Sequence, residues 1–272
     1  MKRSERLVLM THFILDRPRE LISLPFFAEK YDAAKSSISE DLGIINKMFQ
    51  SEGIGYLETV SGAAGGVKYI PAFSKTYSES FVQDLCQRLE DPERLLPGGY
   101  LFMSDLLGDP ETIRNIGRLF ASAFRGKDID AVVTVATKGI PLAYAVASYL
   151  NVPVVIARRD PKVTEGSTVS INYVSGSTRK IQTMVLTKRA LKEGSNVCII
   201  DDFMKAGGTI NGMKNLLKEF NANVAGIGVL AEAEDEEEDR VVEDYLSLVQ
   251  IVNADDRKQS IEVRPGNLLN HI

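Results

Sequence analysis

One stretch, residues 196–210 (NVCIIDDFMKAGGTI), limits the fold of this chain more than any other. It begins with an unbroken apolar run, 197–200, which is typical of a strand buried on both faces of a parallel sheet. Asp201 and Asp202 follow at the place where such a sheet holds its ligands, outside the carboxyl ends of its strands. A tight turn with two glycines, 205–209, then leads into apolar residues at helical spacing. This order of strand, acids, glycine turn and helix predicts an α/β fold with a phosphate-binding loop.

The residue types in this stretch indicate the chemistry of the ligand. Glycines let backbone N–H groups point inward without a side chain in the way, and the following helix start adds partial positive charge. Thr209 supplies a hydroxyl donor and Lys205 a full charge. Carboxylates only accept hydrogen bonds, so the two acids suit vicinal sugar hydroxyls, or a hydroxyl together with hydrated Mg²⁺. A double-glycine turn alone is often only a connection, but the whole combination favours a phosphorylated ribose.

The segment DDFMKAGGT, 201–209, resembles the phosphoribosyl pyrophosphate (PRPP) motif of the type I phosphoribosyltransferases. It departs from the enzyme pattern at Lys205 and Ala206, where those enzymes usually carry small or hydroxyl residues. Ala206 removes a hydroxyl that would help to bind the 5'-phosphate, and Lys205 could replace its contribution electrostatically. This variant resembles the purine operon repressors of Gram-positive bacteria, which share the fold but are regulators. The resemblance implies that PRPP contacts Asp201, Asp202, Phe203, Met204, Lys205, Ala206, Gly207, Gly208 and Thr209.

Length, charge and cysteine usage set broad limits on the rest. A chain of 272 residues is long enough for two domains, and its formal charge of -5 requires any contact with nucleic acid to be local. Cys86 and Cys198 are expected to be buried thiols, and two histidines and two cysteines without metal-ligand spacing predict no zinc site. No signal-type segment follows the start, and no apolar run approaches the roughly 18 residues of a membrane span. We therefore expect a cytoplasmic protein.

The first part of the chain shows the pattern of three helices and a hairpin. Apolar residues at helical spacing occupy 4–15, Ser23 is a plausible cap for a second helix, and a third helix begins near Ser36 or Ser37 and ends before Gly53. Two strand-like runs, 54–60 and 67–70, then flank a glycine-rich tip. We predict a winged helix over residues 1–74, joined to a domain over residues 75–272 that resembles the type I phosphoribosyltransferases and has a mostly parallel sheet.

The third helix of this module begins with small, polar and basic residues, which is what a helix needs to enter a major groove. Basic and acidic residues are equal in number over 1–74, so composition alone also allows a protein-contact module. The module resembles the amino-terminal domain of the purine repressors, and this resemblance favours DNA. The residues predicted to contact DNA are Lys2, Arg3, Lys35, Ser36, Ser37, Ser39 and Lys68.

A strand–helix–strand unit supplies a second candidate loop. Strand-like runs at 131–135 and 153–157 flank a helical pattern over 140–150, and the loop before that helix contains Thr137, Lys138 and Gly139. Because successive parallel strands present their carboxyl ends at one edge, this loop should lie beside Asp201. Such a turn is often only a solvated connection, but in the resembled family the matching loop takes the pyrophosphate.

Several further residues are weaker candidates. Arg158, Arg159 and Lys162 leave the next strand at the same edge, where they could bind anions or be ordinary surface charges. Tyr100 opens a strand-like run, 100–102, expected to enter the second domain, and its ring could stack on a ligand or only pack. Alternating runs over 167–173 and 180–186 suggest a hairpin above the site, which in transferases is a lid. The acidic run 232–239 is expected to be a solvated loop or helical turn.

Two functions remain open on the sequence. The first is a homodimeric repressor of purine biosynthesis genes that binds operator DNA and is released by PRPP, with or without Mg²⁺. The resemblance also implies that guanosine tetraphosphate could compete for the pocket. The second is a purine phosphoribosyltransferase with an appended nucleic-acid-binding module. Transfer needs base-recognising groups that the sequence does not show convincingly, so we expect no catalysis and assign no catalytic residue.

Overall fold

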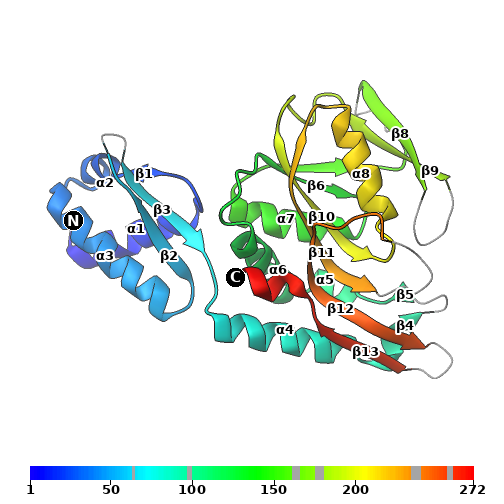
Figure 1. Ribbon diagram of the computed structural model, residues 1–272. Coiled ribbons are helices and arrows are strands. Elements are labelled where there is room, and N and C mark those ends of the chain that lie inside the picture. Colours follow the sequence, from blue (N-terminus) through cyan, green and yellow to red (C-terminus); the bar gives the residue numbers. More distant parts are fainter. Residues whose placement is uncertain (63–64, 97–99, 161–165, 175–180, 234–239, 256–259) are drawn as a thin grey trace.

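The computed structural model describes the chain except residues 63–64, 97–99, 161–165, 175–180, 234–239 and 256–259. Figure 1 shows a smaller amino-terminal part on one side and a larger α/β part on the other. Among the described residues, no helix has the length and apolar character needed to cross a membrane.

The amino-terminal part is a winged helix, as predicted. It consists of α1 (Arg3–Leu15), β1 (Ile22–Ser23), α2 (Leu24–Tyr31), α3 (Lys35–Ser51), β2 (Gly55–Val60) and β3 (Gly66–Pro71). The Ser23 side chain caps α2 by accepting a hydrogen bond of 3.3 Å from the Phe26 N–H, which confirms the predicted start of that helix. The hairpin β2–β3 gains a third, antiparallel strand, β1. The sequence does not predict it, because a strand of two residues is too short to show an alternating pattern.

A buried acid joins the first helix of this part to the third. Asp41 of α3 is fully buried and accepts hydrogen bonds from Arg3 Nε at 2.8 Å and Arg6 Nε at 2.6 Å. The hydrogen bond to Asp41 raises the pKa of Arg3. Arg3 also lies 3.2 Å from the carboxylate of Glu40, which is exposed. Arg3, predicted to contact DNA, therefore has a structural role in holding α1 on α3.

The larger part is built on a six-stranded sheet in the order β13-β12-β11-β10-β6-β7. All neighbours in it are parallel except β12 and β13, which confirms the predicted mostly parallel sheet. Its strands are β6 (Ala131–Val135), β7 (Val154–Ala157), β10 (Asn196–Met204), β11 (Asn223–Ala233), β12 (Leu246–Asp255) and β13 (Ser260–Pro265). The remaining elements are α4 (Lys75–Leu89), η1 (Pro92–Arg94), β4 (Leu95–Leu96), β5 (Tyr100–Leu101), α5 (Ser104–Gly108), α6 (Pro110–Ala123), α7 (Gly139–Leu150), β8 (Thr168–Val174), β9 (Ile181–Thr187), α8 (Gly208–Lys218) and η3 (Asn267–His271).

Helices cover both faces of this sheet. Residues of α4, α6 and α7 share one apolar cluster with the sheet, and residues of α8 and the hairpin β8–β9 share a second cluster with it. The hairpin was predicted, and it packs on α8, where the ring of Tyr173 contacts Gly212. The strand expected at 100–102 is present as β5, which pairs with β4 in a separate small sheet of the larger part and not with the main sheet. The boundary between the domains at residue 74 stays a prediction.

Candidate functional site

The two acids of the motif lie inside a strand, and not after its end as the sequence analysis expects. β10 continues to Met204 because β11 pairs with it as far as Glu232. Its ladder with β6 stops earlier, with Ile199 opposite Val133. Asp201 and Asp202 therefore lie beyond the ladder with β6, and together with the loop that follows β6 they line one hollow. The predicted edge of the sheet is correct, although the predicted end of the strand is not.

A hollow of about 570 Å³ at this edge brings most of the predicted ligand residues together. From the predicted set it is lined by Thr137, Lys138, Arg158, Arg159, Asp201, Asp202, Phe203 and Thr209. Leu101, Met103, Val135, Ala136 and Asp160 complete the lining. Two predicted residues cannot be placed in it, because Lys162 and the side chain of Tyr100 lie outside the described part of the chain.

The glycine turn forms its own small hollow of about 50 Å³, lined by Asp201 and residues 203–210. Gly207 has a φ of +82°, a left-handed conformation that glycine adopts without strain, and α8 begins directly after it. The first N–H groups of a helix have no carbonyl partner within it, so they can bind an anion. The side chains of Met204 and Ala206 are buried, so only the backbone of these two residues remains for a ligand.

The surroundings of Asp201 and Asp202 disfavour the charged forms of both carboxyl groups. Burial, and then the neighbouring charge of Asp202, raise the pKa of Asp201 well above its ordinary value. Burial also raises the pKa of Asp202, and the charge of Lys138 opposes that shift. The Asp202 N–H donates a hydrogen bond of 3.0 Å to Asp201 Oδ1. Two adjoining carboxylates, one buried and one half-buried, fit hydroxyl donors or a hydrated divalent cation, because either partner would relieve their repulsion.

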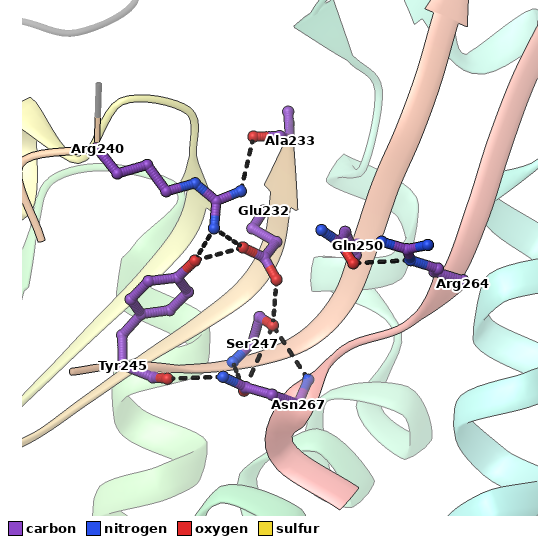
Figure 2. Close-up of polar contacts among 8 residues, drawn as sticks. All are labelled: Glu232, Ala233, Arg240, Tyr245, Ser247, Gln250, Arg264 and Asn267. Carbon is purple, nitrogen blue, oxygen red and sulfur yellow. Dashed lines mark hydrogen bonds and ion pairs between the residues drawn. The ribbon is translucent and has the colours of Figure 1, made fainter. Parts of the chain in front are cut away.

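A segment after β11 braces the back of the glycine turn. The Val241 N–H donates to the Ala206 carbonyl at 3.2 Å, and the buried side chain of Val242 packs against Gly207. Figure 2 shows how Arg240, at the start of this segment, is anchored to Glu232.

Glu232 is the centre of this anchor and corrects one expectation. It is the buried end of β11, not part of a solvated acidic loop, and it accepts hydrogen bonds from Arg240 Nη1 at 2.6 Å, Tyr245 Oη at 2.5 Å and Ser247 Oγ at 2.7 Å (Figure 2). The sequence signal was present but ambiguous, since Glu232 opens an acidic run. The other acids of that run, 234–239, lie outside the described residues.

Gly139, the predicted loop glycine, is required by the space around it. A Cβ on Gly139 would lie 2.3 Å from Thr134 Oγ1, a buried hydroxyl without a hydrogen-bond partner among the described residues, and 3.4 Å from Asp201 Oδ1. Gly139→Ala is expected to destabilise the fold by about 1–3 kcal/mol, because atoms of the core must move. Gly108→Ala, where no atom lies within 4 Å, is the matched control and is expected to be neutral or stabilising. Urea unfolding of both variants checks this, and equal stability would contradict it.

The residues predicted to contact DNA lie mainly on the surface of the winged helix. Lys35, Ser36 and Ser39 are exposed at the start of α3, where Ser37 is half-buried. Lys2 is exposed before α1, and Lys68 is half-buried on β3 opposite Glu58. These side chains, with Arg3, whose side chain is half-exposed beside Asp41, remain candidates for contacts with DNA.

Comparison with known proteins agrees with both halves of the fold. The model of the family "Bacterial purine repressor, N-terminal" matches residues 2–71, and that of the "Phosphoribosyl transferase domain" matches residues 103–263. The solved structure of adenine phosphoribosyltransferase from Thermoanaerobacter pseudethanolicus superposes with a TM-score of 0.53 at 23% identity, over 61% of this chain and 98% of that chain. This likeness supports the fold alone.

Two relatives match over nearly their full length. The purine biosynthesis transcriptional repressor PurR of Bacillus subtilis is 63% identical over 268 residues, which cover 98% of this chain and 94% of that protein. The purine biosynthesis transcriptional activator PurR of Lactococcus lactis subsp. lactis is 45% identical over 270 residues, which cover 99% of each. With such relatives and a winged helix that matches the repressor model, this chain belongs to the family of bacterial purine repressors.

Proposed function

We propose that this chain is a transcriptional repressor of purine biosynthesis and related genes, and that PRPP releases it from operator DNA. The names of its full-length relatives and the match of its winged helix support the DNA-binding half. One observation carries the sensing half: the hollow that joins the two acids, the loop after β6 and the start of α8 at one edge of the sheet. This arrangement has acceptors for a diol between two sites for anionic groups.

Each group in the hollow has a role in this proposal. Asp201 and Asp202 accept hydrogen bonds from the ribose hydroxyls, directly or through hydrated Mg²⁺. The glycine turn holds the 5'-phosphate through N–H groups and Thr209, with Lys205 adding charge. The pyrophosphate lies on the loop after β6, near Arg158 and Arg159. The contacting residues proposed for PRPP are 201–209, Thr137, Lys138, Gly139, Arg158, Arg159, Lys162 and Tyr100.

The fold is shared with enzymes, but we propose that this chain binds PRPP without transferring it. Its relatives of matching length are named as regulators of transcription. Ala206 offers no hydroxyl to the 5'-phosphate, and its methyl group is buried. An enzyme also needs side chains that recognise a base beside the sugar. A phosphoribosyltransferase with an added DNA-binding module is the alternative, and it predicts turnover of PRPP with a purine base.

Two further features belong to the proposal. Guanosine tetraphosphate carries phosphates at both ends of its ribose, so it could occupy the same hollow and oppose PRPP. A homodimer with two-fold symmetry would place two winged helices on neighbouring half-sites of the operator. In each, the exposed start of α3, with Lys35, Ser36 and Ser39, would enter the major groove, and Lys2 and Lys68 would contact phosphates.

The test is a titration of a labelled DNA fragment from upstream of a purine biosynthesis operon, with and without PRPP and Mg²⁺. PRPP is expected to raise the dissociation constant for the fragment by about 5-fold to 150-fold, the usual range of coupling between two sites. A parallel assay with purine bases should show no consumption of PRPP. Unchanged affinity for DNA would contradict sensing, and enzyme-like turnover would favour the transferase.

A further inference from the structure

Two arginines cross between the winged helix and the larger part of the molecule. The first, Arg19, follows α1 and donates a hydrogen bond of 2.6 Å from Nη2 to the carbonyl of Ala121. Ala121 lies in the last turn of α6, where carbonyls have no N–H partner within the helix and carry partial negative charge. The backbone of Arg19 has a φ of +61°, an uncommon conformation for a residue with a side chain. The winged helix thus supplies a cationic cap to the carboxyl end of α6.

The second arginine runs in the opposite direction. Arg118 of α6 donates from Nη2 to the carbonyls of Gly53 at 2.8 Å and Ala72 at 2.7 Å. Gly53 directly follows Glu52, the C-cap of α3, which is the proposed recognition helix, and Ala72 directly follows β3. The guanidinium also lies 4.1 Å from the centre of the Phe73 ring. Arg118 therefore holds the end of the recognition helix and the exit of the hairpin on one side chain.

Neither arginine faces a compensating acid in the part of the chain that the structure describes. No ion pair among the described residues includes Arg19 or Arg118, and in both side chains Nε is buried without a hydrogen-bond partner. Burial lowers the pKa of both guanidinium groups. A partly buried cation held by carbonyl dipoles and, at Arg118, by an aromatic ring is costly to desolvate, so the contact depends closely on its geometry. A small displacement of α6 would therefore change the free energy of the contact between the winged helix and the larger part.

α6 is also tightly fitted to the helix that begins in the ligand loop. A Cβ on Gly117 would lie 2.6 Å from the backbone carbon of Ala145 in α7, so the two helices touch through their backbones. α7 starts at Gly139, in the loop that lines the hollow. On its other side α6 rests on the sheet, where the ring of Phe120 fills the space above Gly228 of β11. Packed interfaces of this kind shift as units and do not deform continuously.

We propose that α6 couples the ligand hollow to the recognition helix, and that Arg118 and Arg19 are the positioning residues of this coupling. A ligand that moves the loop after β6 shifts α7, and α7 shifts α6 through Gly117. α6 then moves both Arg118 and the Ala121 carbonyl that Arg19 holds, and with them the winged helix. Figure 1 shows the winged helix beside the α6 region of the larger part, and β3 and α6 are in contact. This inference rests on the proposed function, because it concerns how that function is transmitted.

The experiment compares the full-length protein with Arg118→Ala, Arg19→Ala, Arg118→Lys and the control Arg114→Ala, an exposed arginine on the same helix. For each, calorimetry measures PRPP binding, and anisotropy measures operator affinity with and without PRPP. Both positioning variants are expected to bind PRPP within about three-fold of wild type, while the effect of PRPP on operator affinity falls to less than about two-fold, outside the usual coupling range. Arg118→Lys keeps the charge and can reach one carbonyl, so an intermediate effect is expected. Arg114→Ala should behave as wild type.

The outcomes separate the inference from the function on which it rests. If wild type neither binds PRPP nor responds to it, the proposed function fails. If wild type responds and both positioning variants respond to the same extent, the coupling through α6 is overturned. If Arg118→Ala no longer binds operator at all, the test rests on Arg19→Ala and Arg118→Lys, for which operator affinity with PRPP is again compared with operator affinity without it. A lost response together with lost PRPP binding in both alanine variants would also overturn it, because the arginines would then act on the ligand hollow itself.

Discussion

Asp202→Asn is expected to weaken PRPP binding by about 30-fold or more and, at the same time, to stabilise the protein against unfolding. The loss of affinity follows because a half-buried charged group proposed to hold the ligand is removed, which costs about 2 kcal/mol or more. The gain in stability follows from the raised pKa of Asp202, since burial penalises its charged form. A carboxyl whose folded-state pKa is raised loses stability as pH rises from its ordinary pKa through the raised value. Asparagine removes that loss.

The measurement is thermal unfolding of wild type and Asp202→Asn between pH 5 and 8, with calorimetry of PRPP binding at pH 7.5. The stability advantage of the variant should grow with pH over the interval in which Asp202 ionises. Asp160→Asn is the matched control, because Asp160 is an exposed acid that lines the same hollow. Its effects on stability should be small. A melting temperature of Asp202→Asn below that of wild type at pH 8 would contradict the electrostatic argument.

Asp41→Ala should have the largest effect on the DNA-binding half. Its carboxylate is fully buried between Arg3 and Arg6, and removal of one member of a buried ion pair costs about 3–5 kcal/mol. Because the pair joins α1 to α3, we expect the winged helix to unfold at lower denaturant and operator binding to be lost. Glu40→Ala is the control: it removes an exposed partner of the same Arg3, which is worth at most about 1 kcal/mol. Urea unfolding and anisotropy check both variants, and equal stability of the two would contradict the structural role of Asp41.

Local patterns in the sequence were sufficient to predict most helices and strands and the edge of the sheet at which the candidate site lies. The cap at Ser23, the unit from β6 to β7 and the apolar run before Asp201 each depend on residues close together in the chain. Strand ends were less predictable. β10 continues through two acids because β11 pairs with it there, and pairing with a distant strand leaves no mark on the local pattern.

The roles that sequence reasoning missed belong to charged residues with distant partners. Arg3, Arg19 and Arg118 are of a residue type that usually lies on the surface, and only the fold shows that each contacts a group far along the chain. The same is true of Glu232, whose partners follow the residues of the acidic run. Burial of a charge is decided by tertiary packing, and periodicity of apolar residues carries no information about it.

The arginines between the two parts bind main-chain oxygens, and this has a consequence for how the family can change. The side chain of Ala72 takes no part in these hydrogen bonds and can change without loss of the junction, whereas Ala121 is fully buried in the core and has to stay small. What has to be inherited is the course of the backbone at the end of α6 and after α3, together with the two guanidinium groups. Winged helices from divergent members can therefore be exchanged, provided that the incoming winged helix carries Arg19 and the recipient keeps Arg118 on α6.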